Sequence, residues 1–174
     1  EYFSISEGDL ISPERSLYAG NLAGNRQDGA MFLGELFEER FSYALGVFNG
    51  PRRSFNDYNS EKDVYLYLNT RPFLKSEDFE FLNYLNLGGC INGGNERNPT
   101  QPNIFTTASD QTSAANDVIV QSLSPTFLAF NSPVTELGRR VQWSGSIAYF
   151  YKSFTLLTEY GGGYQGYSLN RLTS

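Results

Sequence analysis

The chain has 174 residues, 16 % of them aromatic, and a formal net charge of -6. The acidic balance argues against nucleic acid as a partner, because nucleic-acid-binding proteins usually carry a basic stripe. The chain contains no His, which excludes a Ser-His-Asp triad and His-ligated metal sites. We expect no catalytic residues, no cofactor and no metal site.

Alternation of apolar and small polar residues is the main signal along the chain. Six segments show it, at 29–37, 41–49, 64–73, 81–92, 138–151 and 154–166. Each has about 9–14 residues, a length with which a tilted strand crosses a bilayer. Apolar runs are strand-sized and do not approach the ~18–20 residues of a transmembrane helix.

The connections between these segments alternate between short and long. Residues 38–40, 74–80 and 152–153 make short connections, whereas 51–63 and 93–137 make long ones. Bacterial outer-membrane barrels have short turns at the periplasmic end and long loops outside. We therefore predict an all-β fold, a transmembrane antiparallel β-barrel, with residues 1–174 as a single domain.

One face of the predicted strands is apolar and is expected to meet lipid. Its members are Phe41, Tyr43, Leu45, Val47, Leu66, Leu68, Trp143, Ile147, Tyr149, Tyr151, Leu156 and Tyr160. A soluble β-sandwich has the same period of two. Its outer face should be richer in Lys, Glu and Arg than these strands, whose second face holds Ser, Thr, Ala and Gly. The pattern therefore favours the barrel.

The polar face of a porin strand lines the channel, where charged side chains set ion preference through the local field. Candidate pore-lining residues are Glu35, Arg71, Asn86, Arg140, Gln142 and Glu159. The alternative for each is a charge that is only solvated at the rim or paired across strands.

Both long connections leave alternatives open. Residues 93–137 could fold into the lumen and narrow it, pack on a neighbouring subunit, or form a local hairpin without a transport role. Asp57, Glu61 and Asp63 cluster in the other connection and could bind a divalent cation, since hard cations prefer oxygen ligands. A solvated acidic loop is the simpler interpretation.

Several blocks resemble the phosphate-selective porin O and P family. They are PERSL at 13–17, NRQDGAMFLGELFEERFSYALGVFNG at 25–50, TRPFL at 70–74, YLNLGG at 84–89 and LTEYGGGY at 157–164. The resemblance implies a sixteen-stranded barrel in a homotrimer, roughly twice as long as this chain. The six or seven strands expected here would then be part of a larger barrel. The resemblance also adds Arg15, in the Glu-Arg-Ser element, to the pore-lining candidates.

These observations predict a porin in the outer membrane of a Gram-negative-type cell envelope. It would pass small hydrophilic solutes and ions by diffusion, including anions such as phosphate if the resemblance extends to selectivity. Inward-facing Glu35 and Glu159 and the acidic total oppose an anion preference. The alternative is an abundant outer-membrane scaffold barrel whose surface loops bind partners.

Overall fold

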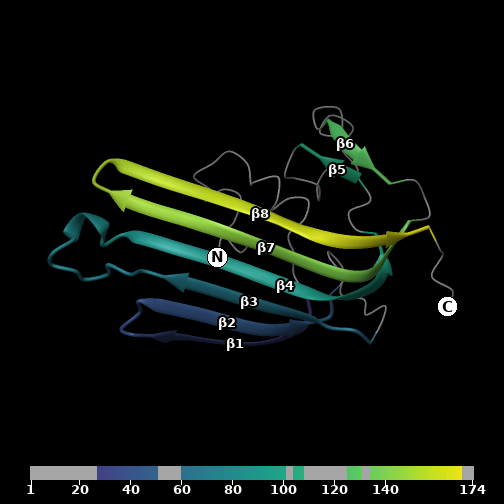
Figure 1. The fold of residues 1–174 in the computed structure, drawn as a ribbon, viewed down its shortest axis with the longest axis horizontal. Helices are drawn as coiled ribbons and strands as arrows, with labels where there is room; N and C mark the ends of the chain where they lie inside the picture. The colour runs from purple at the N-terminus through teal and green to yellow at the C-terminus, as the bar shows by residue number, and fades with distance from the viewer. Residues whose placement is uncertain (1–26, 51–59, 101–103, 108–124, 131–133, 170–174) are drawn as a thin grey trace.

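The computed structural model describes residues 27–50, 60–100, 104–107, 125–130 and 134–169. Six strands form one antiparallel sheet in the order β1-β2-β3-β4-β7-β8 (Figure 1). They are β1 Gly29–Leu36, β2 Phe41–Phe48, β3 Asp63–Thr70, β4 Leu85–Pro99, β7 Thr135–Tyr151 and β8 Phe154–Ser168. A short 3-10 helix, η2 Glu80–Leu82, precedes β4, and β5 Ile104–Thr106 pairs with β6 Thr126–Ala129 in a separate hairpin. The predicted all-β antiparallel architecture is confirmed.

The strand boundaries differ from the prediction mainly around the long connection. Strand β4 begins at Leu85, because residues 80–82 form the 3-10 turn, and it continues to Pro99. Strand β7 begins at Thr135. Residues 93–99 and 135–137 were expected in the long connection 93–137. They belong to the sheet because they pair with one another, from Gly93 opposite Val141 to Pro99 opposite Thr135.

The sheet is open, with β1 and β8 as its edges in the part of the chain that the structure describes. The tightest connection is Lys152–Ser153 between β7 and β8, as predicted. The β1–β2 turn holds three consecutive residues, 37–39, with positive φ. The Arg71 side chain donates two hydrogen bonds to the carbonyl oxygen of Glu39, one of 2.8 Å, and so supports this strained turn.

Strand register places the predicted lipid-facing residues on one face of the sheet. Tyr43 lies opposite Leu68, and Tyr149 lies opposite Leu156. Residues opposite each other in antiparallel strands project from the same face. This apolar face is open to solvent, with Leu45 48 %, Ile147 40 % and Tyr160 73 % exposed.

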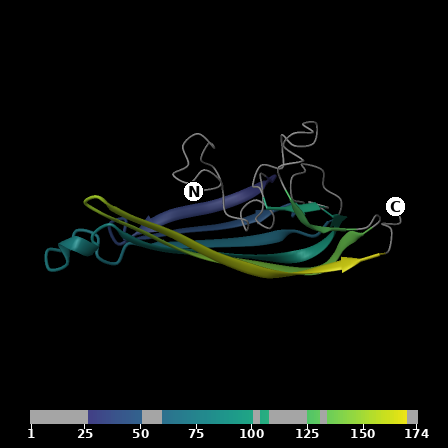
Figure 2. The same cartoon turned by 90° about the horizontal axis from the view of Figure 1, so that it is seen from above.

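The sheet is bowed, and the β5–β6 hairpin lies on its concave side (Figure 2). The Phe130 ring, directly after β6, stacks 4.6 Å from the ring of Tyr167 on β8. Tyr167 lies opposite Glu136, on the face that carries the polar side chains. The polar face is therefore the concave one, and the apolar face is convex.

In the described ranges most of the buried side chains are polar, whereas the side chains buried in folded proteins are usually apolar. Within the described ranges, Phe105 of the small hairpin is the only buried hydrophobic side chain. The buried polar residues are Asp63, Asn92, Glu96, Asn98, Thr135, Glu136, Arg140 and Gln142. The same ranges contain no helix with the length and apolar composition needed to cross a membrane.

Candidate functional site

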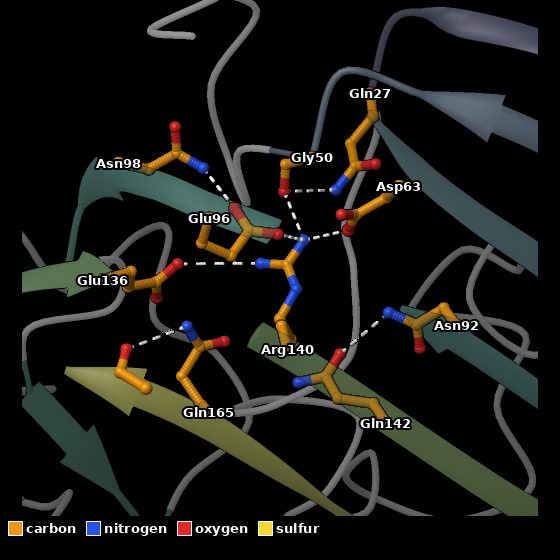
Figure 3. Close-up of polar contacts among 11 residues, drawn as sticks. Gln27, Gly50, Asp63, Asn92, Glu96, Asn98, Glu136, Arg140, Gln142 and Gln165 are labelled. Carbon is orange, nitrogen blue, oxygen red and sulfur yellow. Dashed lines mark hydrogen bonds and ion pairs between the residues drawn. The ribbon is translucent and has the colours of Figure 1, made fainter. Parts of the chain in front are cut away.

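A buried arginine lies at the centre of a cluster of charged side chains on the concave face, at the end of the sheet where β3 begins. Arg140 lies on β7, opposite Gly94 of β4. Its Nη2 donates to the carbonyl oxygen of Gly50, at 2.6 Å, and to the carboxylate of Asp63 (Figure 3). The same nitrogen is 2.8 Å from Glu96 Oε1. The guanidinium therefore joins the chain after β2 to the first residue of β3 and to β4.

Glycine at position 94 makes this reach possible. Gly94 is on the strand between β3 and β7, and a Cβ there would overlap Asp63 Oδ1. Without that side chain, the Arg140 guanidinium can cross β4 and meet a carboxylate two strands away. The ion-pair network thus depends on glycine at position 94 as much as on the charged side chains.

An irregularity in β7 brings a third carboxylate to the arginine. Between Glu136 and Arg140 the pairing with β8 shifts register, and Gly138 there has a φ of 91°. Positive φ is readily adopted by Gly and is typical of bulges. Glu136 Oε2 then lies 3.6 Å from Arg140 Nη1.

Three carboxyl groups share this one guanidinium, and Arg140 is 0 % exposed. Glu96 also accepts a hydrogen bond from the Asn98 amide. Burial, opposed by Arg140 and assisted by Asp63, raises the pKa of Glu96 to about 8. Glu96 is therefore mostly protonated at neutral pH, which reduces the repulsion among the three carboxyl groups.

Further pairs of polar side chains lie along the concave face toward the end of the sheet that carries the β1–β2 and β7–β8 turns, which we call the turn end. The Asn92 amide donates to Gln142 Oε1 at 3.3 Å, and both side chains are buried. At the next pair of opposed residues on the concave face, Cys90 Sγ lies 3.1 Å from Ser144 Oγ. The concave face thus carries polar side chains from Cys90 to Asn98 on β4 and from Glu136 to Ser144 on β7.

Five of the predicted pore-lining residues project from the concave face by register: Glu35, Asn86, Arg140, Gln142 and Glu159. They are not gathered into one cluster. Glu35 is on edge strand β1, opposite Ser42, and Glu159 is on the other edge strand, opposite Ser146. Both glutamates are exposed, whereas Arg140 and Gln142 are buried.

The remaining two candidates lie elsewhere. Arg71 follows β3 at the turn end, where its Nη2 is 3.7 Å from Glu39 Oε2 in addition to its bonds to the Glu39 carbonyl. It therefore supports the β1–β2 turn. Arg15 lies outside the described residues. A role of any of these residues in lining a pore stays a prediction.

Sequence reasoning did not find the partners of Arg140. Asp63 was grouped with the acidic loop, but it is the first residue of β3 and is buried. Glu96 and Glu136 were assigned to the long connection. A signal was present, because Glu96 and Asn98 continue the period of two begun by Asn92 and Gly94. Extension of β4 by that period would have placed them on the concave face.

The acidic residues of the described ranges do not form a group placed to hold a metal ion. Around Arg140, the guanidinium occupies the space between the three carboxyl groups. Asp57, which was considered with Glu61 for a divalent cation, lies outside the described residues. The arrangement at Arg140 is an ion-pair network that holds strands and a connection together.

Comparison with known proteins gives no match, either to protein-family models, to curated proteins or to solved structures. The resemblance to phosphate-selective porins therefore stands on the sequence blocks alone.

Proposed function

We propose that this chain is a section of the wall of an outer-membrane β-barrel, and that the barrel is a porin for passive diffusion of small hydrophilic solutes and ions. The observation that carries the proposal is the inverted polarity of the sheet. In the middle of β4 and β7, large apolar side chains such as Ile91 and Trp143 project from the convex face, whereas polar side chains such as Asn92 and Gln142 project from the concave face. A lipid-facing exterior and a polar lumen require this arrangement.

The apolar face has the height of a membrane. On β7 it runs from Val141 to Tyr151 without a charged residue, which matches the about 9–11 residues of a strand that crosses a bilayer at a tilt. Beyond it, exposed polar side chains begin on the convex face, at Asn95, Arg97 and Arg139. In water so large an apolar surface would favour aggregation or a covering partner. In lipid the same apolar surface would contact hydrocarbon chains and would need no covering partner.

The two sheet edges also fit a section of a larger wall. In the described part of the chain β1 and β8 each pair on one side only. Unpaired backbone groups in hydrocarbon cost several kcal/mol each, so a spanning sheet must close. Additional strands would complete the barrel, consistent with the sixteen strands that the resemblance implies. A homotrimer is part of the same proposal.

The chain's single cysteine gives a direct test. Cys90 lies on the concave face and is half-buried, and its neighbour Ile91 lies on the convex face and is exposed. The full-length protein is reconstituted in a planar bilayer, and single-channel currents are recorded. A small, membrane-impermeant methanethiosulfonate reagent is then added. We expect stable conductance steps that fall after labelling of Cys90.

The matched controls separate the two faces. Cys90→Ser should conduct without responding to the reagent. The combination Cys90→Ser with Ile91→Cys should conduct and stay unlabelled, because its thiol faces lipid. A folded barrel that gives no conductance would favour the outer-membrane scaffold instead. A protein that remains soluble and monomeric without detergent would contradict both barrel functions and favour a β-sandwich.

A further inference from the structure

We propose that the channel face of this chain selects for small inorganic cations over anions. The inference rests on the proposed porin function and specifies its substrate class. It departs from the phosphate selectivity implied by the resemblance. The argument depends on which charges reach the concave face and which are neutralised there.

Carboxyl groups dominate the concave face. By strand register, its acidic residues are Glu35, Asp63, Glu96, Glu136 and Glu159. Arg140 is the only basic residue among the described strand residues of this face. Two other strand arginines, Arg97 and Arg139, lie opposite Leu137 and Asn95 on the convex side. The described strands thus place their acidic residues on the concave face and two of their three arginines on the convex face.

The one basic residue that the described strands place on the concave face is buried and not exposed to the lumen. Arg140 is fully buried and shared by Asp63, Glu96 and Glu136. A guanidinium that is surrounded by carboxylates attracts no further anion, because the local charge is already negative or neutral. Arg140 therefore cannot serve as an anion-binding step in the channel.

Among the described residues, the other basic candidate, Arg71, is also held by a bonded partner. Arg71 is at the turn end of the sheet, and its side chain is bonded to Glu39. Among the described strand residues of the concave face, the exposed charged side chains are Glu35 and Glu159, on the two edge strands of the sheet. Their carboxylates set the sign of the field that a permeating ion meets along this wall.

The expected size of the effect follows from Coulomb's law. A unit charge about 10 Å from an ion in water changes the local ion concentration by about twofold at low salt. Screening reduces this effect as ionic strength rises, since the Debye length is ~10 Å at 0.1 M and ~3 Å at 1 M. Selectivity set by exposed carboxylates should therefore be strongest in dilute electrolyte.

The test is the reversal potential of the reconstituted full-length protein across a KCl gradient. We expect its sign to indicate K⁺ preference over Cl⁻. The double variant Glu35→Gln/Glu159→Gln should lower the K⁺/Cl⁻ permeability ratio by roughly two- to fourfold with little change in conductance steps. Glu38→Gln, an exposed glutamate in the β1–β2 turn, is the matched control and should leave the ratio unchanged.

Each result has a distinct meaning. Channels with Cl⁻ preference would overturn the cation inference and leave the porin proposal intact. Cation preference that is unchanged in the double variant would place the selectivity outside these two carboxylates and so reject this mechanism. Loss of all conductance in the wild-type protein would instead count against the porin function itself.

Discussion

Arg140 on β7 forms a buried ion pair with Asp63 on β3, although β4 lies between their strands. The pair crosses β4 at Gly94, and the same guanidinium holds the Gly50 carbonyl oxygen. Gly50 also accepts a hydrogen bond from the Gln27 side chain, just before β1. One side chain therefore connects the β1–β2 region with β3, β4 and β7 at the same end of the sheet.

Removal of the arginine should strongly destabilise the folded protein. Arg140→Met leaves Asp63, Glu96 and Glu136 buried without their cation, and breaking a buried ion pair typically costs about 3–5 kcal/mol. The measurement is urea unfolding of the full-length protein in detergent micelles, followed by the fluorescence of Trp143. Arg139→Met, one residue away on the exposed convex side, is the control and should change stability by less than about 0.5 kcal/mol. Equal effects of the two substitutions would show that the network is not important for stability.

Gly94 should not tolerate a side chain. In Gly94→Ala the new Cβ would overlap Asp63 Oδ1 and lie 3.1 Å from the Lys62 carbonyl oxygen. Forcing these groups apart should cost about 1–3 kcal/mol, the usual range for overpacking. Gly145→Ala is the matched substitution, since its Cβ would meet only the Gly88 carbonyl oxygen at 3.9 Å. The unfolding midpoints of both variants are compared with wild type, and a neutral Gly94→Ala would contradict the proposed crossing.

The proposed orientation of the sheet predicts that a charge on the convex face impairs folding in lipid, whereas a charge on the concave face does not. Ile147→Arg places a guanidinium in the apolar band and should cost about 2–4 kcal/mol near the bilayer midplane. Ser146→Arg, the adjacent residue on the concave face, should be nearly neutral. The folded fraction in liposomes is measured by heat modifiability on gels. If Ser146→Arg folds less well than Ile147→Arg, the assignment of the two faces is reversed.

Stability should fall as the solution becomes alkaline. Glu96 lies beyond the apolar band, at the level of the exposed Asn95 and Arg97, and its folded-state pKa is raised to about 8 by burial. The unfolded chain releases this proton near the ordinary glutamate pKa of 4.5, so between pH 4.5 and 8 the folded state binds more protons. The contribution of Glu96 is therefore complete below pH 4.5 and is lost as pH rises through 8.

Urea midpoints at pH 5, 7 and 9 test this linkage. Glu96→Gln keeps the shape of the side chain and cannot ionise, so its midpoint should vary less with pH than that of the wild type. Glu38→Gln, in the exposed turn, should retain the wild-type slope. A wild-type midpoint that rises between pH 5 and 9 would contradict a protonated Glu96.

The sequence alone determined the strands and their faces. Alternation with a period of two located all six strands of the sheet, because a strand that separates two environments must place them on alternate residues. Short turns such as Lys152–Ser153 were visible for the same reason, since the apolar period is interrupted there. Membership of Leu45, Ile147 and Tyr160 in one apolar face followed directly.

Only the tertiary structure decided how the inward charges are used. Arg140 and Asp63 are 77 residues apart, and nothing local indicates that they meet. Their contact depends on strand order, on register and on the missing side chain at Gly94, which are all non-local properties. Sequence could therefore place Arg140 on the concave face, whereas the packing around it determines that its charge is buried and neutralised by three carboxyl groups.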